Sequence, residues 1–279
     1  MYPSIRWSIG VAVVTLLGVT PQARAQSTSR LYDKWQIDVS GSVLVMGTDI
    51  RVDGEDGNGT QIDGEDVLGL SREKIQPRVS ARWRPGRRHE IELGYQFARR
   101  TGEKTLDRDV TIGDSTYAVG LDLKTTFRTD QVFLAYRFAI RARERTQLGV
   151  GVGAGFFPFK LEVERLLSAG GSEVTSRNER TLTGPFGSIG VYGRFLLGDR
   201  WYLESDLRGI AIQIDRIEAS VVEGNLAGRY FLSDKWAMEL GYGLSAVTIT
   251  VDPPEDRRGF FGKVEYPVHH VRLGVVLTP

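Results

Sequence analysis

Several side chains in this sequence have types and spacings that could bind a cation or do chemistry. The stretch from Asp53 to Asp66, DGEDGNGTQIDGED, alternates carboxylates with glycines. Hard cations such as calcium and magnesium prefer this kind of oxygen ligand. An EF-hand loop needs glycine at its sixth position, but placing Gly59 there puts Gly54 at the first ligand position, and no helices flank the stretch. We therefore interpret the stretch as a solvated external loop.

A looser cation site in the same stretch stays open as an alternative, because calcium or magnesium needs only several convergent oxygens. The weak candidate ligands are Asp56, Asn58 and Glu65. No other cofactor is predicted. The sequence LGVGVGA has glycines at 149 and 151 and alanine at 154, but a dinucleotide site would need a helix to follow, and FFPFKLEVE continues as a strand.

The three histidines, His89, His269 and His270, are the residues that could take part in hydrolysis. His89 adjoins a predicted tight turn, and neither His269 nor His270 has a serine two residues further on. Hydrolytic catalysis needs histidine within hydrogen-bond reach of a nucleophile or an orienting carboxylate. The sequence therefore predicts structural roles for the histidines and a protein that is not an enzyme.

The most populated group is a set of arginines and carboxylates that share one face of predicted strands. KWQIDVSGSVLV places Trp35, Ile37 and Val39 on one face and Gln36 and Asp38 on the other, and this period of two is the β signal. We count ten such segments, at residues 34–47, 75–85, 89–111, 116–139, 146–164, 181–197, 201–215, 219–232, 236–251 and 261–278. The fold class predicted is an all-β, antiparallel, up-and-down barrel of about ten strands.

The connections between these segments alternate in length. Tight turns lie at residues 85–88, 141–145, 197–200 and 232–235, whereas the linkers at 48–74, 165–180 and 252–260 are long and polar. Transmembrane β-barrels have short periplasmic turns and longer external loops. The polar residues 99–129 still alternate, so we expect them to form a hairpin that projects beyond the bilayer.

The opening residues 1–25 are typical of a signal peptide: Arg6 precedes an apolar run, and Ala23-Arg24-Ala25 resembles a cleavage site. Residues 26–279 would then be a single barrel domain in the outer membrane. Without Arg6 and Arg24 the chain has 34 cationic against 35 acidic residues, which disfavours a nucleic-acid partner. The chain contains no cysteine, so disulfides and zinc–thiolate sites are excluded.

Taken together, these residues resemble those of small Gram-negative outer-membrane β-barrels of the OmpA-like and OmpW-like group. The resemblance rests on the signal ending Ala23-Arg24-Ala25, the alternating strands, and the units Arg194–Trp201 and Arg229–Trp236, each of which joins two strands through a turn and ends in tryptophan. It implies contact with outer-membrane lipid and lipopolysaccharide and insertion by the barrel-assembly machinery. The chain departs from the group's usual aromatic ending, because it ends in VVLTP.

Large aromatic residues gather beside the short turns, where an interfacial girdle is expected. The predicted girdle comprises Trp35, Trp83, Tyr136, Phe195, Trp201, Tyr230 and Trp236.

With lipid outside, the charged face must line the lumen. The predicted lumen network comprises Arg78, Arg82, Arg84, Glu90, Glu92, Arg137, Arg194, Glu204, Asp206, Arg208, Arg229, Glu239 and Arg272. Buried charges persist only when they are paired, and a barrel little wider than eight strands is filled by its side chains. A plugged lumen with a role in envelope structure or surface interaction is therefore the first hypothesis. A narrow, porin-like pore for small anionic or amphipathic solutes is the second, and a soluble periplasmic β protein is the third.

Overall fold

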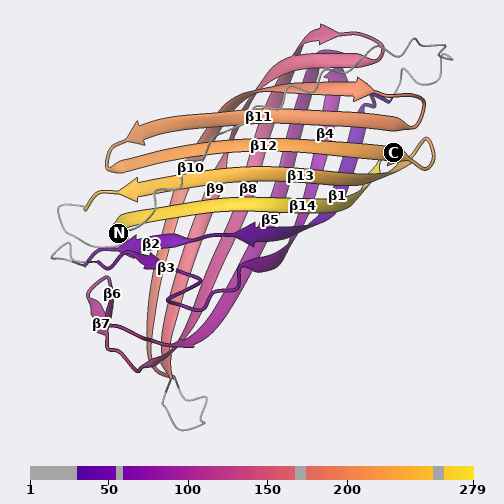
Figure 1. The fold of residues 1–279 in the computed structure, drawn as a ribbon. Coiled ribbons are helices and arrows are strands. Elements are labelled where there is room, and N and C mark those ends of the chain that lie inside the picture. Colours follow the sequence, from indigo (N-terminus) through magenta and orange to yellow (C-terminus); the bar gives the residue numbers. More distant parts are fainter. Residues whose placement is uncertain (1–29, 55–58, 167–173, 254–260) are drawn as a thin grey trace, which may run out of the picture.

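The computed structural model describes residues 30–54, 59–166, 174–253 and 261–279, and its regular structure consists of β-strands (Figure 1). No helix in these four ranges is long and apolar enough to cross a membrane. The predicted signal peptide lies outside the described residues.

Ten antiparallel strands close into a barrel, as predicted. In barrel order they are β1 (Trp35–Met46), β4 (Glu73–Gly86), β5 (His89–Thr105), β8 (Asp122–Ala142), β9 (Thr146–Leu166), β10 (Val174–Leu196), β11 (Trp201–Ile214), β12 (Ile217–Phe231), β13 (Trp236–Val251) and β14 (Gly262–Leu277). The first and last strands pair with each other, with Val39 opposite Val275, and this pairing closes the barrel.

The short connections, such as those between β4 and β5 or β10 and β11, lie together at what we call the turn end. The opposite end, where the long connections lie, is called the loop end. At the loop end the predicted hairpin of residues 99–129 is present, because β5 and β8 stay paired from Ala98–Thr129 to Thr105–Asp122. Its tip differs from the prediction: residues 110–112 and 115–117 leave the barrel strands and form a small separate hairpin, β6 (Val110–Ile112) and β7 (Ser115–Tyr117).

A second difference concerns β10, which begins at Val174 instead of near residue 181. The sequence of residues 174–180 is mostly polar and predicts a loop, but this segment pairs with β9. Pairing with a long neighbouring strand therefore outweighs the weak strand signal of the residues themselves.

The turn-end part of the barrel has its apolar side chains outside and its polar side chains inside. In β1 the odd-numbered Ile37, Val39 and Val43 are exposed, whereas the even-numbered Asp38 and Ser40 are buried. The same exposed row continues around the barrel with Leu93, Val152, Leu207, Leu240 and Leu273. A water-soluble β-sandwich would bury these side chains, so an apolar belt around a polar interior argues for lipid outside the barrel.

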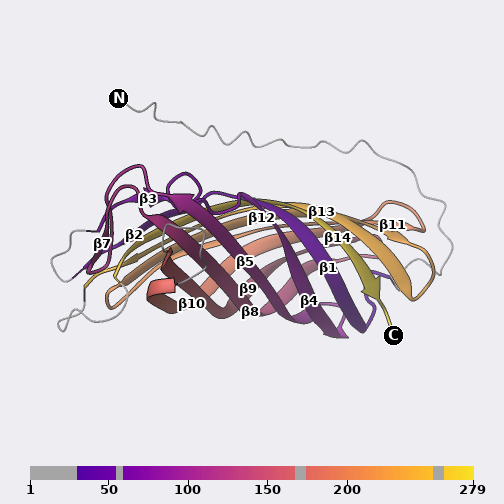
Figure 2. The same cartoon turned by 90° about the horizontal axis from the view of Figure 1, so that it is seen from below.

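The loop-end part has the reverse arrangement, with apolar side chains in its interior. Tyr266 of β14 packs against Phe127 of β8 and Phe159 of β9, with ring centroids 5.9 Å and 6.1 Å apart. These strands lie on opposite sides of the barrel, so the two walls meet there. The loop end is therefore closed like a two-layer sandwich, and Figure 2 shows its flattened profile.

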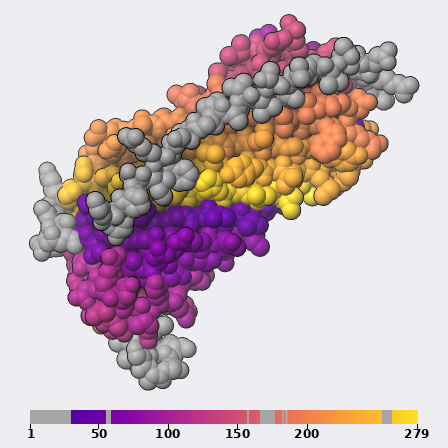
Figure 3. Space-filling view, in the orientation of Figure 1, coloured from indigo at the N-terminus to yellow at the C-terminus, as the bar shows by residue number. Residues whose placement is uncertain are grey.

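Two short strands from the first long connection add to this closed end. They are β2 (Asp49–Val52), which pairs with β14, and β3 (Ile62–Asp63), which pairs with β2. Together with β6 and β7 they lie in the indigo and magenta part of the molecule in Figure 3, which they share with the hairpin of β5 and β8.

The wall of the barrel is interrupted towards the loop end at two places, between β4 and β5 beyond the pair Arg78–Gln96 and between β10 and β11. Strands β10 and β11 are paired from Leu196–Tyr202 only as far as Ile189–Gly209. Beyond that point β10 stays with β9 and β11 stays with β12, so the two strands diverge towards the loop end (Figure 1). We call this gap in the strand pairing the β10/β11 divide.

Candidate functional site

The centre of the turn-end lumen is a buried arginine held by two carboxylates. Arg194 of β10 has no exposed side-chain surface. Its two terminal amino groups donate to both carboxylate oxygens of Glu90, at 2.6 Å and 2.7 Å, and one of them also donates to Glu204 at 3.1 Å. Gln147 accepts a further bond at 2.9 Å. This forked geometry is the strong form of the arginine–carboxylate pair.

The glutamates of the turn-end lumen each accept hydrogen bonds from more than one arginine. Arg137 donates to Glu90 at 2.6 Å and to Glu92 at 2.8 Å. Glu92 also accepts from Arg78, and Glu239 accepts from Arg229 and Arg272. Arg84 donates to Glu90 at 2.6 Å.

These pairs cross the lumen as well as joining neighbouring strands. Arg82 of β4 donates to Glu204 of β11 at 2.9 Å, and these two strands are not adjacent in the barrel. Arg229 of β12 reaches Gln36 of β1 in the same way, at 3.3 Å. The charged groups thus fill the turn-end lumen as one connected network, which we call the lumen network.

Glycines in β9 make room for an aromatic member of the network. A Cβ atom at Gly149 would lie 2.7 Å from the Tyr192 ring and 2.1 Å from the Phe138 carbonyl oxygen. The Tyr192 ring in turn faces Arg194, with the guanidinium 4.9 Å from the ring centroid. Glycine is required at Gly149 because any side chain would displace the ring that packs on Arg194.

The remaining predicted members, Asp206 and Arg208, lie nearer the loop end. The Arg208 Nε lies 3.1 Å from both Asp206 and Glu223. Sequence reasoning missed Glu223, together with the polar partners Gln36 and Gln147. The signal for Glu223 was present, because it shares the face of Arg229 in β12.

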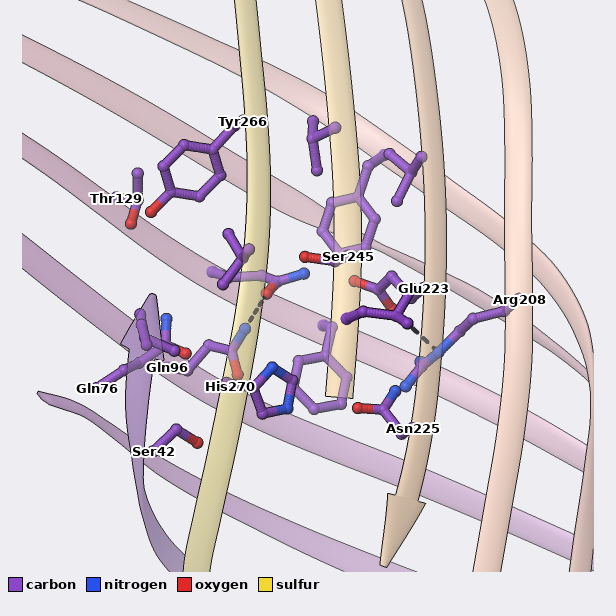
Figure 4. A pocket seen from close by; sticks show the side chains of 18 of the residues that line it. Ser42, Gln76, Gln96, Thr129, Arg208, Glu223, Asn225, Ser245, Tyr266 and His270 are labelled. Carbon is purple, nitrogen blue, oxygen red and sulfur yellow. Dashed lines mark hydrogen bonds and ion pairs between the residues drawn. The ribbon is translucent and has the colours of Figure 1, made fainter. Parts of the chain in front are cut away.

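Beyond the network, an internal cavity of about 120 Å³ lies between the polar and the apolar parts of the interior. Its polar wall includes Arg78, Arg208, Arg272, Asn225 and His270, and its apolar wall includes Phe186, Val221, Ile249 and Tyr266. Figure 4 shows Arg208, Asn225 and His270 on one side and Tyr266 on the other. The sequence analysis did not predict this cavity, because alternation shows which face is inside but not where the interior is empty.

The described part of the acidic stretch is folded into the loop end instead of lying free in solvent. The Glu65 carboxylate is buried, pairs with Arg100 of β5 and accepts a bond from the Thr48 backbone N–H at 3.0 Å. This corrects the interpretation as a solvated loop: a partner arginine in the projecting hairpin makes burial of Glu65 favourable. Asp56 and Asn58 lie outside the described residues, so a cation site there stays a prediction.

The predicted girdle residues all lie on outward-facing positions near the turn end. Trp35 stacks on Trp83 with centroids 5.9 Å apart, and Trp201 contacts Tyr230 at 5.0 Å. Trp236 and Tyr136 are exposed, and Phe195 is half-buried.

The three histidines are in separate places. His89 hydrogen-bonds to Tyr136 at 2.8 Å near the turn end, and His269 hydrogen-bonds to Tyr242 at 3.0 Å on the outer surface. His270 lines the cavity. Within the described residues, His270 makes no hydrogen bond to a serine or to a carboxylate.

A closed barrel, a lipid-facing apolar belt and a charged interior define the class of protein. The chain has the fold of a small Gram-negative outer-membrane β-barrel protein, and the soluble β-sandwich alternative does not describe its barrel.

Comparison with known proteins agrees with this fold. No protein-family model and no curated protein sequence matches the chain. Among solved structures, the outer-membrane protease OmpT from Escherichia coli is similar with a TM-score of 0.55 and 12% identity, over 88% of this chain and 97% of that chain. The translocator domain of the autotransporter NalP from Neisseria meningitidis has a TM-score of 0.49 and 12% identity, over 88% of each chain. At this identity the similarity to OmpT establishes the fold alone.

Proposed function

We propose that this protein is a non-enzymatic outer-membrane barrel with a closed lumen, which acts in envelope structure or in interactions at the cell surface. The single observation that carries the proposal is the lumen network, in which the pairs Arg82–Glu204 and Arg194–Glu90 connect strands across the barrel. A pore lined with free arginines would attract anions. Here the arginine charges are compensated by carboxylates, and their side chains occupy the space that an ion would need.

The positions of the histidines support a non-enzymatic role. His89 and His269 are engaged by tyrosines on the outer surface of the barrel, at opposite edges of the apolar belt. A histidine that packs against an interfacial tyrosine anchors the barrel at the membrane surface, as interfacial aromatic residues do.

The proposal includes export and assembly. Residues 1–25 would direct export, and the barrel-assembly machinery would insert the chain among outer-membrane lipid and lipopolysaccharide. Membrane fractionation tests this directly, combined with gel electrophoresis of unboiled and boiled samples. We expect the protein in the outer-membrane fraction with a shift on heating, whereas release by osmotic shock without a shift would contradict a membrane location.

Single-channel recording in planar bilayers tests the closed lumen. We expect no steady conductance from the wild-type protein. The double variant Arg82→Ser with Glu204→Ser removes both partners of a cross-lumen pair, so it leaves neither partner of that pair behind as a buried charge. We expect this variant to conduct, and Arg88→Ser at an exposed turn is the matched control. Steady conductance of the wild type that falls when Arg137 or Arg194 is neutralised would establish the narrow pore instead.

A further inference from the structure

The cavity beyond the lumen network differs from the network in having two chemically distinct walls. On one side lie aromatic and aliphatic side chains, among them Phe186, Val221 and Tyr266. On the other side lie guanidinium, amide and hydroxyl groups. A cavity that only completed the apolar core would have one kind of wall, whereas a ligand site combines an apolar lining with a few convergent polar groups.

The polar wall favours an anion. Among the described residues that line the cavity are three arginines, Arg78, Arg208 and Arg272, and one acidic residue, Glu223. Each arginine is held from behind by a carboxylate: Arg78 by Glu92, Arg208 by Asp206 and Arg272 by Glu239.

These pairings leave donors for a ligand. Glu239 accepts from the Nε of Arg272 at 2.9 Å, so the two terminal amino groups of this arginine keep N–H donors for the cavity. The Arg208 Nε lies at ion-pair distance, 3.1 Å, from Asp206 and from Glu223, without a hydrogen bond to either. Guanidinium groups fixed in this way match a carboxylate, which accepts two parallel hydrogen bonds.

The size of the cavity limits the apolar part of a ligand. Its volume of about 120 Å³ is close to that of an engineered protein cavity of about 150 Å³ that binds benzene. The apolar body of a ligand should therefore be about one aromatic ring or a short alkyl chain.

The β10/β11 divide lies beside this cavity, at a place where no strand pairing joins β10 to β11. Phe186 and Arg208 line the cavity from the two strands that separate, next to the last pair, Ile189–Gly209. Along the barrel axis the cavity is bounded by the lumen network at the turn end and by the packed Tyr266, Phe127 and Phe159 rings at the loop end. A ligand could reach the cavity through the divide without breaking either.

We propose that the cavity binds a small amphipathic carboxylate, with an apolar body of about one aromatic ring, which enters sideways between β10 and β11. The carboxylate contacts Arg208 and Arg272, and the apolar body contacts Phe186, Val221 and Tyr266. The site borders the lumen network and shares Arg78 and Arg272 with it. Ligand binding and conductance are separate measurements, so the binding proposal and the closed-lumen proposal can still fail separately.

Isothermal titration of the protein in lipid nanodiscs tests the site, with benzoate and hexanoate as probes and benzyl alcohol as the neutral analogue. We expect saturable binding of at least one carboxylate, and affinity at least about tenfold lower for the alcohol, because it loses charged hydrogen bonds. Absence of saturable binding of both carboxylates overturns the site, and equal affinity for the alcohol overturns the anion assignment.

Pairs of matched variants test whether the ligand binds in this cavity. Val221→Trp fills the cavity, whereas Val222→Trp places the same side chain on the exposed outer face of β12. We expect loss of benzoate binding only for the first. Arg272→Gln should weaken benzoate at least about tenfold and leave benzyl alcohol unchanged. If Val221→Trp, folded as judged by its heat-dependent gel shift, binds benzoate like the wild type, then the ligand lies elsewhere.

The chain has no cysteine, so an engineered pair can test the route of entry. Gly187→Cys with Ala211→Cys places one thiol on each side of the divide, and a Cβ at Gly187 would make only ordinary contacts. A short bis-maleimide, or oxidation, then ties β10 to β11. We expect the association rate of benzoate to fall at least about tenfold after cross-linking, with each single-cysteine variant as control. An unchanged rate after complete cross-linking overturns lateral entry.

Discussion

At the scale of single residues, the buried charges carry the largest energies in the molecule. Arg194 is fully buried and donates two hydrogen bonds to Glu90 and one to Glu204, so its removal would take these bonds and one compensating charge away from two buried carboxylates. Breaking a buried pair by removing one partner typically costs about 3–5 kcal/mol. We therefore expect Arg194→Met to lower the free energy of unfolding by about that amount.

Urea titration of the protein in lipid vesicles measures this effect. Arg88→Met, on an exposed turn, serves as control and should change the free energy of unfolding by less than about 0.5 kcal/mol. Equal stability of the two variants would contradict the network's role in holding the barrel together.

A second residue-scale prediction concerns pH and lies at the loop end. Burial and then the facing carboxylates of Asp63 and Glu265 raise the pKa of Asp49 above its ordinary value. Because the folded state favours the protonated form, the charged form destabilises it at neutral pH, and this penalty disappears as the pH falls below the ordinary value of about 4. We expect Asp49→Asn to be more stable than the wild type at pH 7.

The midpoint of the heat-dependent gel shift, measured between pH 4 and pH 8, checks this sign. The advantage of Asp49→Asn should shrink as the pH falls, and Asp107→Asn at an exposed turn should show no such trend. An advantage that grows towards low pH would contradict the assigned direction.

At the residue scale, the sequence predicts which side chains face the lumen. It does not predict which of these side chains contact each other. Alternation alone places Arg82 and Glu204 on the polar face, but their contact depends on the width of the barrel and on the tilt of strands that are not neighbours.

At the scale of elements, the folded loop end depends on contacts between the first long connection and the projecting hairpin. Arg100 of β5 is buried against Glu65 and Thr48, whereas the preceding Arg99 points outward and is exposed. We expect Arg100→Met to increase amide hydrogen exchange in β2 and β3, because Glu65 loses its partner. Arg99→Met is the matched control, and identical exchange in the two variants would show that this pair does not hold the connection in place.

Long barrel strands could be predicted from period-two alternation, and the short elements could not. Asp49–Val52 and Ile62–Asp63 are too short to show a period and lie beside a glycine-rich acidic run. The pairing of β2 with β14 and of β3 with β2 comes from tertiary packing, which overrides the turn-forming tendency of such residues. The β10/β11 divide could not be predicted either, because the alternating segments 181–197 and 201–215 both extend past the last pair, Ile189–Gly209.

At the scale of the whole molecule, the two ends of the barrel differ in where their apolar side chains lie. They face outward at the turn end and inward at the loop end. Val152 of β9 faces outward in the apolar belt, and Thr181 of β10 is exposed beyond it. A charge on the lipid face near the middle of a bilayer costs about 2–4 kcal/mol. We therefore expect Val152→Arg to lower the free energy of unfolding in vesicles by about that amount, and Thr181→Arg to have little effect. Similar losses for both variants would place Thr181 in lipid as well and move the membrane boundary.

The membrane barrel and the soluble sandwich were alternatives at the level of sequence, since alternation alone does not reveal which face meets water. The structure combines features of both, with an inverted barrel at the turn end and an apolar interior at the loop end. The aromatic residues that crowd the turn end indicated the first part correctly. The apolar contact of Tyr266 with Phe127 and Phe159 was not foreseen, because it joins segments far apart in the chain.

This apolar contact also bears on how the chain crosses the bilayer during assembly. The segments that carry Phe127, Phe159 and Tyr266 have to pass through the membrane before their rings can meet on the far side. After the rings have packed, withdrawal of these segments through the membrane would separate the rings and expose them to water. The free energy gained by burying them would then be lost. Under the insertion route proposed above, packing at the loop end makes insertion directional, because these stabilising contacts form last, on the side of the membrane that the loop end reaches.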